Sequence, residues 1–217
     1  MRPYNWAFTW SRAQILQDSP AEQSELNIFL SENLHTRWIC LSKSPMAVPV
    51  FFIKKKDSSL WLVQDYRNLN AVTVKNKYLL PLISELVLQL QEVKYFTKLD
   101  VCWGFNNVWI KPRDEWKAAF HTNYGIFEPL VMFFSMTNNL TTFQTMINDI
   151  FCDFTAEDIM IVYLDNISIF IWTLEEHHIA VQMVLEVLAK HRLFLYSEKC
   201  EFDKLQIEYL ELVISKD

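Results

Sequence analysis

The chain contains very little glycine. Only 2 of its 217 residues are Gly, far below the ~7% average, so few turns can use the freedom of glycine at positive φ. No uninterrupted apolar run reaches the ~18 residues expected of a membrane-spanning helix. The N-terminus lacks the basic region and apolar stretch of a signal peptide. We therefore expect an intracellular protein of the cytoplasm or nucleus that is not secreted and has no membrane partner.

Metal-binding patterns of cysteine and histidine are also missing. The chain has 4 Cys and 5 His, and the cysteines lie far apart, without the spacing of a zinc site. We expect free thiols in a reducing compartment. His177 and His178 are adjacent in a predicted helix, where their side chains should point in different directions, so they predict no zinc site.

Charge is unevenly distributed along the chain. The net charge is −6 overall, but residues 37–117 hold 13 basic and 7 acidic residues, whereas the remainder holds 7 basic and 19 acidic ones. A basic lobe could contact phosphates while an acidic lobe holds metal ions. Ordinary solvated surface charge gives the same count, so charge alone does not decide between these interpretations.

The pattern of hydrophobic residues predicts a mixture of helices and strands. A length of 217 residues with 51% hydrophobic content is sufficient for one good-sized domain or two small lobes. Capping boxes at 19–22 and 173–176 predict the starts of two helices, the second ending near Lys190. Apolar periodicity predicts further helices from Pro81 and over 141–154, two strands around a lysine-rich turn within 49–70, strands at 95–101 and 108–110, and a final hairpin over 194–215.

The most informative segment is the tetrapeptide at 163–166, Tyr-Leu-Asp-Asn. Apolar β-rich runs flank it on both sides, which predicts a hairpin with Asp165 at its tip. Asp100 ends another apolar run, so the two carboxylates can converge if their strands pair. Each Asp taken alone is equally consistent with a turn or helix-cap residue.

Several blocks in order resemble one protein family. From about residue 21 to 217 the chain is similar to the reverse transcriptase domain of gypsy-type long-terminal-repeat (LTR) retrotransposons, closest to fungal elements. The blocks that carry the resemblance are Gln-Asp-Tyr-Arg-Asn-Leu-Asn at 64–70, Phe-Thr-Lys-Leu-Asp at 96–100, Thr-Phe-Gln-Thr-Met at 142–146, the hairpin at Asp165 and Glu-Lys-Cys-Glu-Phe at 198–202.

The resemblance implies an α+β fold, with the fingers and palm of a right-hand polymerase and an antiparallel palm sheet backed by helices. It places the fingers at about 21–84 and 117–140, and the palm at about 85–116 and 141–217. Residues 1–20 remain unassigned. No thumb is expected within this sequence.

The resemblance also implies roles for individual residues. Asp100 and Asp165 would hold Mg²⁺ or Mn²⁺ for two-metal nucleotidyl transfer, with Asn166 as the third, altered catalytic position. The implied nucleotide-binding residues are Lys54, Lys55, Lys56 and Phe105, and those contacting template or primer are Arg67, Phe143, Gln144, Tyr163 and Leu164. The implied partners are an RNA or DNA template with its primer and deoxynucleoside triphosphates. Core packing for Phe105 and a solvated turn for the lysines are the alternatives.

Some residues depart from the family pattern. The family has a second Asp where this chain has Asn166, an Arg where it has Trp61, and Gly where it has Ser135 and Glu211. Asn offers a carbonyl oxygen but no charge, so the metal site would lose one of three negative charges. These changes predict a degenerate and impaired copy, a pseudoenzyme, and the expected lack of a thumb predicts that the copy is also truncated. A non-catalytic nucleic-acid-binding remnant and an unselected pseudogene product are the alternatives.

Overall fold

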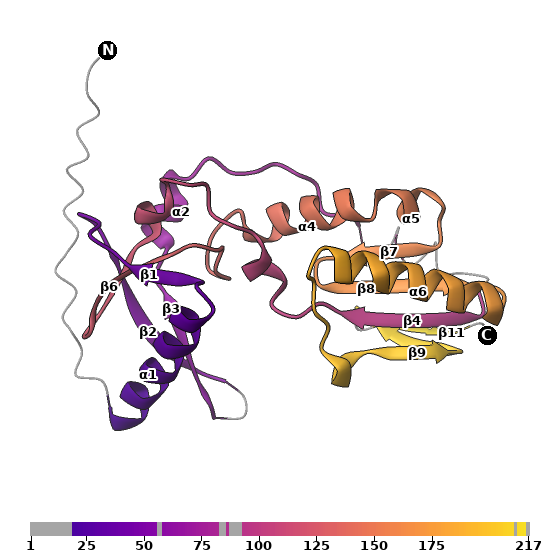
Figure 1. Ribbon diagram of the computed structural model, residues 1–217, viewed down its shortest axis with the longest axis horizontal. Helices are drawn as coiled ribbons and strands as arrows, with labels where there is room; N and C mark the ends of the chain where they lie inside the picture. The colour runs from indigo at the N-terminus through magenta and orange to yellow at the C-terminus, as the bar shows by residue number, and fades with distance from the viewer. Residues whose placement is uncertain (1–18, 56–57, 83–85, 87–92, 211, 216–217) are drawn as a thin grey trace, which may run out of the picture. The chain divides into compact units, whose positions relative to one another are not determined.

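The computed structural model describes residues 19–55, 58–82, 86, 93–210 and 212–215. The chain forms two compact units (Figure 1). The first unit consists of residues 1–73 and 109–136, and the second of residues 74–108 and 137–217. Within the described residues, no helix is both long and apolar enough to cross a membrane. All four cysteines are free thiols.

The first unit is a five-stranded sheet with one long helix packed on it. The helix is α1 (Pro20–His35), and the strands, in spatial order, are β1 (Ile39–Leu41), β6 (Gly125–Pro129), β5 (Phe120–Thr122), β2 (Val48–Lys54) and β3 (Leu60–Gln64). The β2–β5 pair is parallel and the other pairs are antiparallel. Short helical segments α2 (Arg67–Val72) and η2 (Glu115–Ala118) complete the unit.

The sequence signals at the start of α1 are confirmed. The Ser19 hydroxyl accepts from the Glu22 backbone N–H, and the Glu22 carboxylate accepts from the Ser19 N–H, which satisfies two otherwise unpaired helix-terminal donors. Leu26 and Leu30 from the inner side of α1 pack against Phe120 and other apolar side chains of the sheet. The contact with these two leucines therefore defines which face of the first sheet is buried.

The second unit has a four-stranded antiparallel sheet. Its strands, in spatial order, are β7 (Met160–Tyr163), β8 (Asn166–Ile171), β4 (Tyr95–Asp100) and β9 (Glu201–Lys204). A separate hairpin joins β10 (Gln206–Tyr209) to β11 (Leu212–Ser215). The helices are α4 (Asn139–Ile150), α5 (Cys152–Ala156) and α6 (Leu174–Lys190), with short η1 (Gly104–Asn107) and η3 (Ser197–Lys199). Figure 1 shows α4 and α6 beside this sheet.

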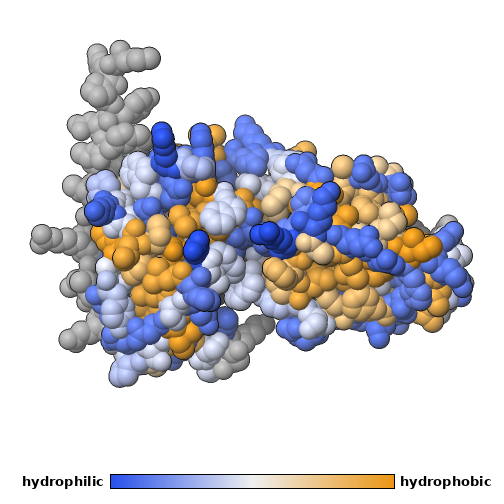
Figure 2. All heavy atoms as spheres, in the orientation of Figure 1, coloured by the Kyte–Doolittle hydropathy of each residue, from blue (hydrophilic) through white to orange (hydrophobic). Residues whose placement is uncertain are grey.

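Alternation along the strands separates two cores in this unit. Leu99, Val162 and Ile167 face Phe143 of α4 and Val184 of α6. On the opposite face, Phe96, Ile161 and Phe170 pack against the apolar side chains of β10 and β11. Successive side chains of a strand point to opposite faces, so one sheet supports helices on one side and a hairpin on the other. Apolar side chains also reach the surface of both units (Figure 2).

Three expected elements differ from the structure. The strand expected at 108–110 is only an isolated bridge between Trp109 and Val131. The helix expected over 141–154 is two helices, with Phe151 between α4 and α5. The hairpin expected over 194–215 is shorter, because β9 pairs with β4 and only β10 and β11 form the hairpin. The helix expected from Pro81 lies largely outside the described residues.

Candidate active site

Strand pairing places the two predicted metal ligands side by side. β4 and β8 run antiparallel with Asp100 directly opposite Asn166. The Val101 N–H donates to the Asp165 carbonyl at 2.8 Å, so the β7–β8 turn lies against the end of β4. The convergence of Asp100 and Asp165 that the sequence predicts is therefore present, and it arises within the second unit alone.

The turn that carries Asp165 is tight and strained. Tyr163 pairs with Asn166, so Leu164 and Asp165 are the only residues between the strands. Leu164 has φ 54°, in the left-handed region that costs a non-glycine residue roughly 1–2 kcal/mol. A turn with positive φ at its first central position matches the right-handed twist of the paired strands. In a chain with so little glycine, a leucine takes this position.

The side chain of Gln144 in α4 hydrogen-bonds to this turn and to the end of β7. Its side-chain carbonyl accepts from the Leu164 N–H at 2.7 Å. Its amide donates to the Val162 carbonyl at 3.2 Å and to Asn148 Oδ1 at 2.8 Å. The Gln144 side chain is completely buried, so these bonds are made in a low-dielectric environment where an unpaired polar group is costly.

Phe143 and Phe105 pack beneath the same region. Phe143 is completely buried, and its ring meets the ring of Phe105 edge-on with centroids 5.5 Å apart. A Cβ added to Gly104 would lie 2.8 Å from Phe143 Cζ, closer than real contacts allow. One of the two glycines is therefore required by close packing rather than by a turn.

The Asp165 carboxyl group is partly buried and lies near a second carboxylate and one lysine. Burial raises the pKa of Asp165 above its ordinary value; the charge of Asp100 raises it further, while Lys199 opposes both. The Lys199 ammonium lies 3.5 Å from Asp100 Oδ1. Desolvation and like charge both disfavour ionised carboxylates, and a cation bound between the two would reverse that effect.

The oxygen atoms here suit a hard divalent cation. Asp100 and Asp165 supply carboxylate oxygens, the ligands that Mg²⁺ and Mn²⁺ prefer. Asn166 donates its amide N–H to Asp165 Oδ1 at 3.3 Å, so it adds no negative charge. Within the part of the chain that the structure describes, no three His, Cys, Asp or Glu side chains form a metal-binding group. The residues present fit a cation with two carboxylate ligands.

The remaining predicted residues occupy different places. Tyr163 and Leu164 lie in the strand end and turn at Asp165, whereas Phe143 and Gln144 lie in the interior. In the first unit, Lys54 ends β2 and Lys55 follows it, both with exposed side chains. Arg67 is exposed and pairs with both carboxylate oxygens of Asp65. Lys56 lies outside the described residues. The nucleotide and template roles of these residues remain predictions.

Two features of the second unit were missed by the sequence analysis. We call the hydrogen bonds from Gln144 to Val162 and Leu164 the Gln144 clamp. Its only local sequence signal is one polar residue in an apolar stretch. His177 and His178, expected to diverge, both approach Asp203, with Nε2–carboxylate distances of 3.7 and 3.0 Å. Buried His177 also contacts Thr97 Oγ1 at 2.8 Å, which ties α6 to β4 and β9.

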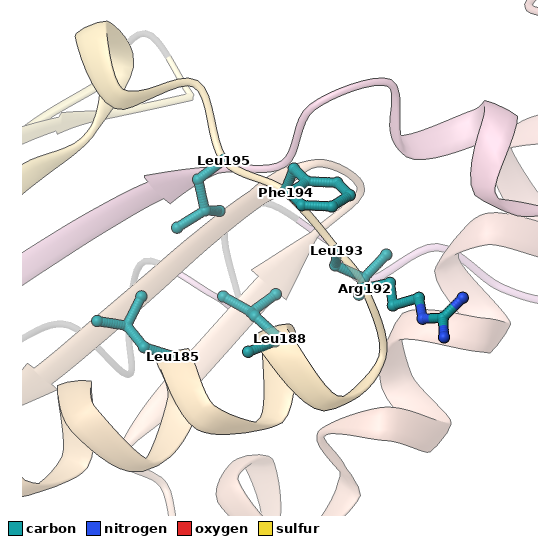
Figure 3. A pocket seen from close by; sticks show the side chains of 7 residues that line it. Leu185, Leu188, Arg192, Leu193, Phe194 and Leu195 are labelled. Atoms are coloured by element: carbon teal, nitrogen blue, oxygen red, sulfur yellow. The ribbon is translucent and has the colours of Figure 1, made fainter. Parts of the chain in front are cut away.

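An apolar pocket of about 340 Å³ lies at the C-terminal end of α6. In Figure 3 the side chains of Leu185, Leu188 and Leu195 gather around it, while the guanidinium of Arg192 points away. The pocket brings no convergent polar groups together, so it does not extend the site at Asp100.

Comparison with known proteins agrees with this geometry. Residues 53–214 match the family model described as reverse transcriptase (RNA-dependent DNA polymerase). The Transposon Tf2-7 and Tf2-3 polyproteins of Schizosaccharomyces pombe (strain 972 / ATCC 24843) are each 34% identical over 197 residues, covering 91% of this chain. The chain spans about 15% of the length of these relatives.

Solved structures show the same fold. The foamy viral protease-reverse transcriptase in complex with RNA/DNA hybrid superposes with a TM-score of 0.81 at 18% identity, covering 91% of this chain and 26% of that one. The Prototype Foamy Virus Protease-Reverse Transcriptase CSH mutant gives a TM-score of 0.78 at 22% identity, with the same coverage. The α+β architecture of polymerase fingers and palm is confirmed. This chain belongs to the reverse transcriptase (RNA-dependent DNA polymerase) family.

Proposed function

We propose that this chain is the fingers and palm part of an RNA-directed DNA polymerase from a gypsy-type LTR retrotransposon polyprotein of fungal origin, working inside the cell. Its substrates would be deoxynucleoside triphosphates and a primer annealed to an RNA or DNA template. The pairing of β4 with β8, which sets Asp100 beside the turn carrying Asp165, is the observation that carries the proposal.

The roles of the residues follow from their positions. Asp100 and Asp165 would hold Mg²⁺ or Mn²⁺, which when bound would activate the attacking 3′-oxygen and stabilise the leaving oxygen. The Tyr163–Leu164 end of the turn would position the primer, and Gln144 would keep that turn fixed. Lys54 and Lys55 would bind triphosphate in the first unit, and Arg67 would support the template.

Asn166 limits this activity. It lies directly opposite Asp100 in the sheet, where a carboxylate would add a third negative charge. We propose that the natural chain is an impaired copy whose metal affinity and turnover are reduced. Loss of groups that only support a metal ligand already costs roughly 10- to 100-fold, so loss of a ligand charge should cost at least as much.

Primer extension on an RNA template tests the proposal. The natural chain is compared with Asn166→Asp in Mg²⁺ and in Mn²⁺. Asn123→Asp, in the exposed β5–β6 turn, is the control for added negative charge. Asp165→Asn is the negative control, because it removes one of the two carboxylates. Extension by Asn166→Asp, at least roughly tenfold above the natural chain, supports the proposal. Absence of extension by every variant, with native circular dichroism, overturns it.

A second candidate is a nucleic-acid-binding remnant without catalysis. The ion pair between Lys199 and Asp100 favours it, because an internal cation already neutralises part of the site. This candidate predicts salt-sensitive binding of a primer–template duplex without metal-dependent extension by any variant.

A further inference from the structure

An apolar opening into the core of the second unit lies at the C-terminal end of α6. Four leucine side chains line the pocket of about 340 Å³ there: Leu185, Leu188, Leu193 and Leu195. Two of them are buried in the core and two are only partly buried. Apolar surface left in contact with water forgoes the free energy of burial, so this pocket gains from an apolar occupant.

The chain leaves α6 beside the pocket through a turn that carries an unusual residue. The Leu193 N–H donates to the Leu188 carbonyl at 2.9 Å, and the Arg192 N–H donates to the Ala189 carbonyl at 3.1 Å. This is the Schellman pattern of a helix C-terminus, in which glycine usually takes the left-handed position. Here Arg192 takes it, with φ 56°. The turn explains the positive φ but not a long cationic side chain at this place.

The positive charge beside the pocket contrasts with the second unit as a whole. Residues 74–108 and 137–217 hold 9 basic and 17 acidic residues, yet Lys190 and Arg192 lie two positions apart with exposed side chains. The ion pairs among the described residues involve neither of them. The dipole of α6 favours Lys190, which lies in its last turn. Arg192 follows the helix, and the dipole does not require it.

An exposed aromatic ring completes this surface. Phe194 lines the pocket and is 72% exposed. In Figure 3 its ring and the Arg192 side chain extend to the same side of the segment that follows α6. We name the pocket together with Lys190, Arg192 and Phe194 the α6-end surface. An occupant that matches it is apolar at one point and negatively charged beside that point.

We propose that the α6-end surface docks a short acidic peptide segment of a partner protein. A leucine or phenylalanine of that segment enters the pocket, and neighbouring carboxylates pair with Arg192 and Lys190. Charge complementarity selects this occupant, because a purely apolar segment would leave both cations unused. A nucleic-acid base would find no hydrogen-bonding side chains among the leucines. The proposal does not depend on polymerase activity, since the pocket does not extend the site at Asp100.

Fluorescence anisotropy with labelled peptides and the full chain tests the proposal. The probes are Ser-Asp-Glu-X-X-Asp-Glu-Ser, in which both X residues are Leu, Phe or Ala, so the alanine peptide keeps the charge without the large side chains. Ala189→Leu fills the pocket from an exposed helix position, and Arg192→Gln removes one cation. The matched controls are Gln182→Leu, at another exposed position of α6, and Lys204→Gln, at an exposed lysine of β9.

The expected result is binding that needs both the apolar side chain and the charge. The alanine peptide should bind at least about 30-fold more weakly than the leucine or phenylalanine peptide, the loss typical of an anchor side chain in a desolvated pocket. Ala189→Leu should weaken the leucine peptide by a similar factor. Arg192→Gln should weaken it by up to about fivefold and reduce its salt dependence, as expected for an exposed ion pair. Gln182→Leu and Lys204→Gln should bind like the natural chain, and circular dichroism should be native in every variant.

Several results would overturn the proposal. They are absence of binding by the leucine and phenylalanine peptides up to their solubility, equal binding of the alanine peptide, and undiminished affinity in Ala189→Leu. If Arg192→Gln weakens an oligothymidylate that the peptides do not displace, the surface contacts nucleic acid instead. If Ala189→Leu abolishes a concentration-dependent dimer in analytical ultracentrifugation and no peptide binds, the surface is a contact between copies.

Discussion

Replacing Gln144 with Leu should loosen the hairpin that carries Asp165. Leu is close to Gln in size, so the change leaves little cavity in the interior but removes the bonds to the Leu164 N–H and the Val162 carbonyl. An unsatisfied donor costs about 1–3 kcal/mol and a lost neutral hydrogen bond about 1 kcal/mol. Together these give a loss of about 2–4 kcal/mol, acting on a turn already strained at Leu164.

Hydrogen exchange followed by mass spectrometry measures this effect locally, which suits a chain with two compact units. Protection of peptides spanning 160–170 should fall by about 30-fold or more, the equivalent of about 2 kcal/mol. Gln182→Leu is the matched control, because exposed Gln182 on α6 bonds only to the neighbouring Glu186 among the contacts described. If Gln144→Leu changes protection no more than Gln182→Leu, the reasoning about the clamp is wrong.

Three further perturbations have defined outcomes. Gly104→Ala should destabilise the second unit by about 1–3 kcal/mol, because its Cβ would lie 2.8 Å from buried Phe143. In thermal unfolding, the double variant with Phe143→Leu should regain part of this stability. An unchanged melting temperature in Gly104→Ala refutes the argument. Burial lowers the pKa of His177, so the unfolded chain takes up a proton that the native state resists, and stability should fall as pH drops through about 6.5 towards the lower folded-state value. His177→Gln should flatten that slope in urea unfolding, exposed His191→Gln should not, and equal slopes would contradict the burial argument. Lys199→Gln should strengthen Mn²⁺ binding by up to about fivefold at low salt, because the Lys199 side chain of the pair is exposed to solvent and a pair screened in this way contributes about 0–1 kcal/mol. Weaker binding by calorimetry would show that Lys199 does not compete with the metal.

The hairpin at 163–166 shows how much of the site local sequence can predict. Apolar runs on both sides of a polar pair require strands that end there, and β7 and β8 confirm this. The pairing of β4 with β8 follows from two apolar strands needing partners, which is why Asp100 and Asp165 converge as expected.

The expected strand at 108–110 shows where local pattern fails. Periodicity states which side chains share a face but not which strand provides hydrogen-bond partners, and Trp109 finds only Val131. The C-terminal hairpin was overextended for a related reason, because β9 leaves it to pair with β4 at the edge of the sheet. Partner choice in a sheet depends on segments distant in sequence.

The sequence by itself determined the capped helices and the two carboxylates at strand ends, because each depends on residues within one short segment. It also determined the family and the α+β class, because several characteristic blocks occur in order along the chain. Only the tertiary structure decided that Gln144 clamps the turn, that both histidines meet Asp203, that Gly104 makes room for Phe143 and that Trp61 meets Phe134. These contacts join residues from about 20 to more than 70 positions apart. They form because burial of apolar surface brings whole elements together, and no local pattern encodes which side chains then meet.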